Sequence, residues 1–183
     1  MKILQGAIGL SALYLLAGCG QVTEKTLTFD VPYGMYETVL RQNVTGTGQL
    51  TCKVTTDNQD RGEKWVPSVI LAAAEDAAED AAEDDTLFLS SYTPTDSDQR
   101  LFQLRTFNKA KPVIDTFFHR APDQRGVYTL RLTWQADGAI GYQVASGGAW
   151  EERKLVDKPG FSVRHVSVHA SGMKGSAVCE LRE

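Results

Sequence analysis

Most of the chain from residue 26 onward alternates apolar and polar positions over short stretches. Apolar and β-branched residues recur at every second position, and Gly, Pro, Asn and Asp separate the stretches. Successive side chains of a β-strand point to opposite faces, so this alternation predicts half-buried strands. The predicted strands lie near residues 26–31, 36–44, 48–56, 65–72, 86–92, 100–107, 112–119, 126–135, 139–146, 162–169 and 175–182.

The clearest strand runs from Val127 to Trp134, where Tyr, Leu, Leu and Trp occupy one face and Thr, Arg and Thr the other. The pair Asp137-Gly138 follows, and the alternation resumes from Ile140 to Val144. An Asp-Gly pair between two alternating stretches is a strong signal for a hairpin. Many short strands separated by turns predict an all-β fold, an antiparallel sandwich or barrel.

One segment, residues 73–85, departs from this pattern. It reads Ala-Ala-Glu-Asp three times and ends in Asp85. Its alanines favour a helix, but its carboxylates repel one another at a spacing of four residues. It lacks the Gly or Asn that would fold a loop around Ca²⁺, so we expect no defined metal site and only loosely held cations. We interpret the segment as a solvated insertion at the tip of a hairpin.

The N-terminus has the organisation of a bacterial lipoprotein signal peptide. An uncharged tract runs from Ala7 to Leu16 and ends in Leu16-Ala17-Gly18-Cys19, which resembles a lipobox. The tract is too short to span a membrane, which requires roughly 20 apolar residues. The resemblance implies a signal peptide over residues 1–18, a lipidated tether over 19–25 and a domain over 26–183. It also implies an exported protein held in the membrane by a multiply acylated Cys19.

The residue after the lipobox cysteine gives an expectation about location. In bacterial lipoproteins an Asp at this position often signals retention in the inner membrane. This chain has Gly20 there, so the resemblance implies the outer membrane.

The charge distribution argues against nucleic acid as a partner. The formal net charge is −4, and seven of the 23 acidic residues lie between Glu75 and Asp85. The remainder of the chain is nearly neutral, without a dense basic patch.

The two other cysteines, Cys52 and Cys179, form an even pair in a chain expected to be exported, which predicts a disulfide. Cys52 shares a strand face with Leu50 and Val54, and Cys179 shares one with Ala177 and Leu181. Both cysteines should therefore point into the core. The bridge would join an early strand to the last one.

The segment Gly126–Val144, with its Tyr-x-Leu-x-Leu-x-Trp strand, a turn and a Tyr-x-Val strand, resembles a hairpin of concanavalin A-like domains of the lectin and LamG type. The ending also fits, with alternation over Val163–His169, Gly172 and Gly175 in a turn, and a last strand over Ser176–Arg182. The resemblance implies a jelly-roll β-sandwich whose first and last strands lie close together. It implies glycan as the ligand class.

No residues with a catalytic pattern are apparent. Concanavalin A-like enzymes that cut β-glucans carry a Glu-x-Asp-x-x-Glu strand, which supplies a pair of carboxylates, and this chain has none. Nor does it contain HExxH, CxxC or GxSxG. We interpret His119, His165 and His169 as surface or loop residues, and we expect no cofactor.

Aromatic side chains are the remaining candidates for ligand binding, because the apolar face of a sugar packs on a flat ring. Trp134 and Tyr142 belong to the predicted core faces. Trp150 follows a flexible Gly pair beside charged residues and is the first candidate; Trp65, after Glu-Lys, is the second.

The sequence therefore favours a lipid-anchored envelope protein whose domain binds glycan without catalysis. A structural or accessory lipoprotein that binds another envelope protein is the alternative. An enzyme that degrades polysaccharide is the least favoured.

Overall fold

The computed structural model describes residues 21–57, 67–76, 85–94, 97–109, 111–122, 126–157 and 159–183. These residues form two antiparallel sheets and no helix, so none of them forms a helix that could cross a membrane. The predicted all-β sandwich is confirmed. The signal peptide and Cys19 lie outside the described residues, as do Trp65 and residues 77–84 of the acidic segment.

The seven-stranded sheet has the order β1-β13-β3-β8-β9-β10, with β11 also pairing with β9. Its strands are β1 (Val22–Asp30), β3 (Gly48–Thr56), β8 (Val127–Trp134), β9 (Ile140–Ser146), β10 (Ala149–Trp150), β11 (Lys154–Val156) and β13 (Lys174–Arg182).

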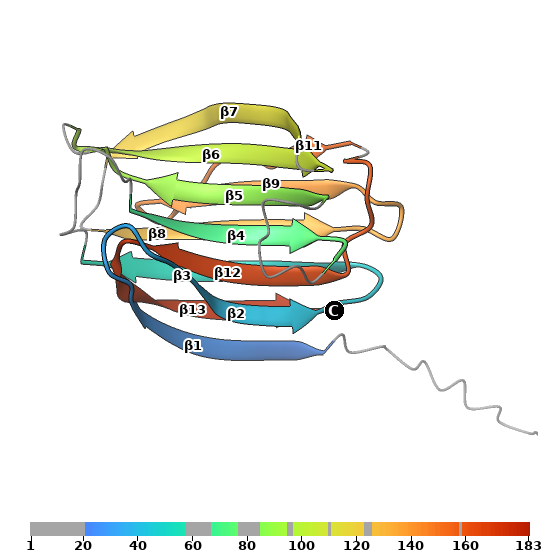
Figure 1. The fold of residues 1–183 in the computed structure, drawn as a ribbon, viewed down its shortest axis with the longest axis horizontal. Coiled ribbons are helices and arrows are strands. Elements are labelled where there is room, and N and C mark those ends of the chain that lie inside the picture. Colours follow the sequence, from blue (N-terminus) through green and yellow to red (C-terminus); the bar gives the residue numbers. More distant parts are fainter. Residues whose placement is uncertain are drawn as a thin grey trace, which may run out of the picture.

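The six-stranded sheet has the order β2-β12-β4-β5-β6-β7 and lies in front of the first sheet in Figure 1. Its strands are β2 (Tyr36–Asn43), β4 (Ser68–Ala74), β5 (Thr86–Tyr92), β6 (Gln99–Asn108), β7 (Lys111–Pro122) and β12 (His165–Ser171).

The core lies between the two sheets and uses alternate residues of each strand. Trp134 and Tyr142 are buried there, as the sequence predicted. The turn after β8 is also as expected: Gly138 has a φ of 89°, which a glycine adopts without strain. Almost completely buried aliphatic side chains fill the centre from both sheets: Leu50, Val54, Val69, Leu71, Leu87, Leu89, Leu104, Leu130, Leu132, Val166 and Val168.

The predicted disulfide between Cys52 and Cys179 is present. The two residues lie directly opposite each other on β3 and β13, with Cα atoms 4.0 Å apart. Both side chains are buried, because the alternation of each strand turns them toward the core. The bridge therefore lies inside the sandwich and joins an early strand to the last one, as expected.

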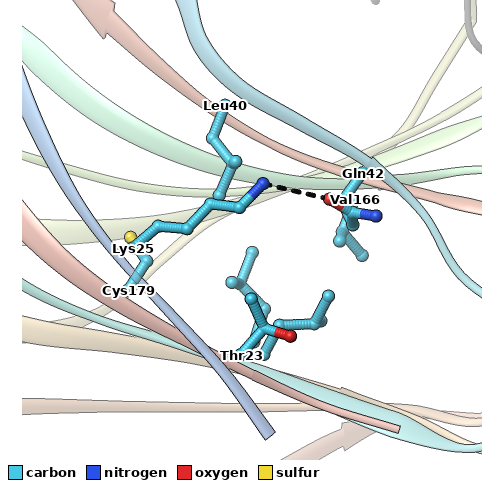
Figure 2. A pocket seen from close by; sticks show the side chains of 8 residues that line it. Thr23, Lys25, Leu40, Gln42, Val166 and Cys179 are labelled. Atoms are coloured by element: carbon cyan, nitrogen blue, oxygen red, sulfur yellow. Dashed lines mark hydrogen bonds between the residues drawn. The ribbon is translucent and has the colours of Figure 1, made fainter. Parts of the chain in front are cut away.

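The first strand begins earlier than the sequence suggested. β1 starts at Val22, and Val22 to Lys25, which we had placed in the tether, pair with Arg182 to Cys179 of β13. β1 lies at the edge of its sheet, so polar residues occur on both of its faces and no alternation marks its start. At this edge Lys25 Nζ donates a hydrogen bond to Gln42 Oε1 of β2 at 3.2 Å, which links the two sheets (Figure 2).

The acidic segment is confirmed as an insertion between paired strands. Val69 to Ala74 of β4 pair with Ser91 to Thr86 of β5, so the two strands form a hairpin. Ala73 and Ala74, which we had assigned to the insertion, are part of β4. Glu75 N donates to Asp85 O at 3.2 Å, and this bond closes the base of the insertion.

Candidate functional site

The outer face of the six-stranded sheet, which we call the polar–aromatic face, carries aromatic rings and hydrogen-bonded polar side chains. Residues that alternate with the core positions point outward from this sheet. The register aligns them in rows across all six strands. One row runs Thr38, His169, Ile70, Ser90, Gln103, Phe117. The next runs Arg41, Ser167, Ala72, Phe88, Arg105, Asp115.

His169 lies within this face and is 2% exposed. Its ring stacks on Tyr36, with centroids 4.9 Å apart, and Phe88 meets it edge-on at 6.5 Å. Its Nδ1 lies 2.9 Å from Thr38 Oγ1, and its Nε2 lies 2.7 Å from Ser167 Oγ. Hydroxyl groups can donate or accept, so they satisfy both nitrogens of a neutral imidazole.

Burial and, to a smaller extent, the positive charge of the nearby Arg41 together lower the pKa of His169 to about 4. The side chain is therefore neutral at neutral pH and acts as a fixed structural element of the face. Our interpretation of His169 as a surface residue was wrong. His119 of β7 is partly buried. The centroid of its ring lies 5.5 Å from that of Phe102, and its Nε2 lies 3.4 Å from Glu151 Oε1.

Two pairs of aromatic rings lie on the same face, one next to His169 and the other farther along the sheet on β5 and β7. Phe88 and Phe107 meet edge-on with centroids 5.6 Å apart, and Tyr92 and Phe117 do so at 5.9 Å. Phe117 is 47% exposed, so its ring is open to solvent. Burial raises the pKa of the Tyr92 hydroxyl, which therefore stays protonated and can donate a hydrogen bond at neutral pH.

Polar side chains next to these rings are held in place by one another. Gln103 Nε2 donates to Asp115 Oδ1, and Arg105 Nε lies 3.5 Å from the same oxygen. Fixed amide, guanidinium and carboxylate groups beside a flat ring can orient the hydroxyl groups of a sugar. The face thus combines an exposed aromatic ring with hydrogen-bonding groups whose positions are already fixed.

Trp150, the first candidate from the sequence, lies on the opposite sheet. It belongs to β10 and is 39% exposed, so the expected exposure is present. The guanidinium of Arg131 lies 3.8 Å from the centre of its ring. Arg131 is itself fixed by Thr51 Oγ1 at 3.1 Å and Gln143 Oε1 at 3.2 Å. Trp150 and Arg131 therefore form a second, smaller candidate binding surface on the opposite sheet, in which one face of the Trp150 ring is in contact with the guanidinium.

Two further features bear on chemistry. Among the described residues, no three His, Cys, Asp or Glu side chains lie close enough together to hold a metal ion.

The crevice between β1 and β2 in Figure 2 has a volume of about 10 Å³, and its lining includes Leu40, Val166 and Cys179. A space of this size holds at most one water molecule, so it is no ligand site.

Comparison with known proteins gives matches in fold only. No protein-family model and no curated protein sequence matches the chain. A legume lectin-like domain from Entamoeba histolytica aligns with a TM-score of 0.56 and 9% identity over 88% of this chain and 86% of that domain. The carbohydrate recognition domain of Emp46p, in a potassium-bound form, aligns with a TM-score of 0.54 and 9% identity over 90% of this chain and 87% of that domain. The carbohydrate recognition domain of Emp47p aligns with a TM-score of 0.50 and 10% identity over 90% of this chain and 80% of that domain.

The fold is legume-lectin-like. The concanavalin A-like sandwich expected from Gly126–Val144 and from the last strand is therefore confirmed. The polar–aromatic face was not identified from the sequence. A signal for part of it was present in the Phe-x-Ser-x-Tyr alternation of Phe88 to Tyr92, which places an aromatic, a hydroxyl and an aromatic side chain on the face opposite Leu87 and Leu89.

Proposed function

We propose that the domain is a non-catalytic carbohydrate-binding module and that glycan binds on the polar–aromatic face. The observation that carries this proposal is the exposed ring of Phe117, which lies beside Tyr92 and next to Gln103 in the same row. A pyranose could stack on this ring while the half-exposed side chains of Arg105 and Asp115, the latter held by Gln103, bond to its hydroxyls. Support also comes from the lectin-like fold.

We further propose that the protein is exported and anchored by acyl chains on Cys19, in the outer membrane of the cell. The lipobox-like sequence Leu16-Ala17-Gly18-Cys19 supports this part. Two or more acyl chains give stable attachment, whereas one gives only marginal binding. The anchor would hold the glycan-binding domain at the surface of a membrane.

A glycan array probed with residues 20–183 tests the binding function. We expect reproducible binding to a restricted set of glycans, and Phe117→Ala should weaken it by roughly tenfold, equivalent to about 1.4 kcal/mol for one lost stacking contact. Phe117 is 47% exposed, so its replacement should not unfold the domain.

Trp150→Ala is the matched control, because it removes a similarly exposed ring from the opposite sheet. It should leave binding unchanged. Loss of binding in Trp150→Ala alone would move the site to the surface formed with Arg131. The absence of any glycan binding would overturn the function and favour a protein partner.

A further inference from the structure

The outer face of the seven-stranded sheet carries two arginine side chains on neighbouring rows of residues. One row pairs Arg131 of β8 with Gln143 of β9. The next row pairs Thr133 with Gly141, and Arg153 lies over it. Alternate residues of a strand are about 7 Å apart, so the two rows have roughly that spacing. This face lies on the opposite side of the sandwich from the polar–aromatic face (Figure 1).

The guanidinium of Arg131 is fixed on the first row. Its Nε donates to Thr51 Oγ1, and its Nη1 donates to Gln143 Oε1. The ring of Trp150 covers one face of the guanidinium. Gln143 is held in turn, because its Nε2 donates to Glu151 O at 2.8 Å. No described residue bonds to Nη2 of Arg131, so the N–H groups of this nitrogen can bond to a ligand.

The guanidinium of Arg153 is fixed on the second row. Its Nη2 donates to Thr133 Oγ1 at 2.8 Å. A Cβ atom on Gly141 would lie 2.7 Å from both Nε and Nη2 of Arg153, which is closer than such atoms can approach. The absence of a side chain at Gly141 therefore lets this guanidinium lie against the sheet. Its Nε and Nη1 bond to no described residue and face a ligand in the same way as Nη2 of Arg131.

The positive charges of these two arginines are not neutralised by the described residues. No described carboxylate lies within ion-pair distance of Arg131 or Arg153. Burial, and after it the positive charges of Arg182 and Arg153, lower the pKa of Arg131, while Glu180 opposes this effect. Glu180 is itself in an ion pair with Arg182. Arginine stays protonated in proteins, so two fixed like charges lie side by side without a counter-ion.

We propose that Arg131 and Arg153 form a second binding site, which takes a phosphomonoester group. Guanidinium groups bind phosphate through charge-assisted hydrogen bonds, often two from one arginine. Since such bonds are about 2.8 Å long, one phosphate fits between guanidinium groups on rows about 7 Å apart. A phosphomonoester carries a charge of about −1.5 to −2 near neutral pH and so balances the two arginines, whereas a carboxylate or a sulfate ester carries a single charge.

This site is independent of the proposed glycan site. It lies on the other sheet and shares no residue with the polar–aromatic face, so either site can be present without the other. Two sources could present the same group: a phosphorylated sugar, or the headgroup of phosphatidic acid in a membrane. The chemistry of the contact is the same in both.

An NMR titration of residues 20–183, which include every described residue, tests the site. The probe is methyl phosphate, and methyl sulfate is the singly charged control of the same shape. We expect saturable shifts of the Nε–H signals of Arg131 and Arg153 and of the Gly141 amide with methyl phosphate, and several-fold weaker binding of methyl sulfate. The absence of saturable shifts at both arginines, or equal binding of the two probes, would overturn the proposal.

Three variants separate a built site from general attraction by charge. Arg153→Gln should weaken methyl phosphate binding roughly tenfold, because one of the two guanidinium groups is lost. Gly141→Ala keeps every charge and should also weaken binding, because its Cβ displaces Arg153. Lys154→Gln is the matched control: it removes the same charge from the next residue, but its Nζ lies 5.4 Å from the centre of the Phe118 ring on the other sheet. It should leave binding unchanged.

Arg153 is exposed, so Arg153→Gln should fold as the wild type does, and its result decides the matter even where Gly141→Ala lowers the melting temperature. Equal weakening by Arg153→Gln and Lys154→Gln would overturn the site. Sedimentation with vesicles distinguishes the two sources. Capture by phosphatidylcholine vesicles that contain phosphatidic acid, lost in Arg153→Gln, would assign the site to a lipid headgroup. Methyl phosphate binding without such capture would assign it to a phosphorylated sugar.

Discussion

Removal of the disulfide should cost several kcal/mol of folding stability. Cys52 and Cys179 are 127 positions apart in the sequence, so the bridge closes a long loop in the unfolded chain. The chain-entropy model gives about 5 kcal/mol for a loop of this length, and measured losses for native disulfides are typically 2–5 kcal/mol. We expect Cys52→Ala/Cys179→Ala to lower the free energy of unfolding by about 2–5 kcal/mol.

Urea denaturation of the oxidised wild type beside the double variant measures this loss. Reductant should destabilise the wild type and leave the double variant unchanged, because only the wild type has a bridge to lose. β3 and β13 pair over eight residues, so the double variant should keep the same sheet order. Equal unfolding midpoints for the oxidised wild type and the double variant would contradict a stabilising role for the bridge.

Acid should destabilise the fold through His169. Its pKa is about 4 in the folded state, against the ordinary value of 6.5 that applies to the unfolded chain. The unfolded state therefore binds a proton first as the pH falls. The stability that comes from the neutral buried ring is fully present above pH 6.5, declines as the pH falls below that value, and is lost by about pH 4. The contribution of His169 to the free energy of unfolding therefore falls by about 3 kcal/mol between these two ends of the pH range.

His169→Gln should reduce this acid loss, because glutamine does not titrate and its amide can still bond to Thr38 and Ser167. The measurement is the free energy of unfolding of wild type and variant in urea between pH 7.5 and pH 4. His165→Gln is the matched control, since His165 lies on the same strand and face but is only partly buried. A wild-type loss that persists in His169→Gln would assign the acid sensitivity to other groups.

Local patterns explain why much of the sandwich was predictable. The hairpin of β8 and β9 was expected from strict alternation on both sides of Asp137-Gly138, and the structure has it within one residue at each end. The disulfide was expected because Cys52 and Cys179 each share a face with apolar neighbours. Such features depend on residues next to each other in sequence.

Other elements carry no such local signal. β10 and β11 have two and three residues, too few for any alternation to show, and they were not predicted. After Val22 the next residues of β1, Thr23 to Lys25, are polar on both faces because the strand lies at a sheet edge. Strand formation there is dictated by pairing with β13, which lies far along the chain.

The candidate site was the least predictable part, because it is made by tertiary contacts. His169 follows Val-Ser-Val in an alternating strand, so the pattern correctly places it on the outer face of the sheet, away from the core valines. Its burial comes from Tyr36 and Phe88 on other strands, and Thr38, which bonds to it, is 131 positions away in the sequence. Trp150 was recognisable as exposed, but its contact with Arg131 was not.

Mapping of the bound glycan by backbone NMR is the most direct test of the proposed site. The sample is residues 20–183, titrated with the glycan that gives the strongest array signal. We expect the largest shift changes in β5, β6 and β7 around Tyr92, Gln103 and Phe117, with little change in β8 to β10. Shift changes centred on Trp150 and Arg131, with none on the polar–aromatic face, would contradict the proposed site.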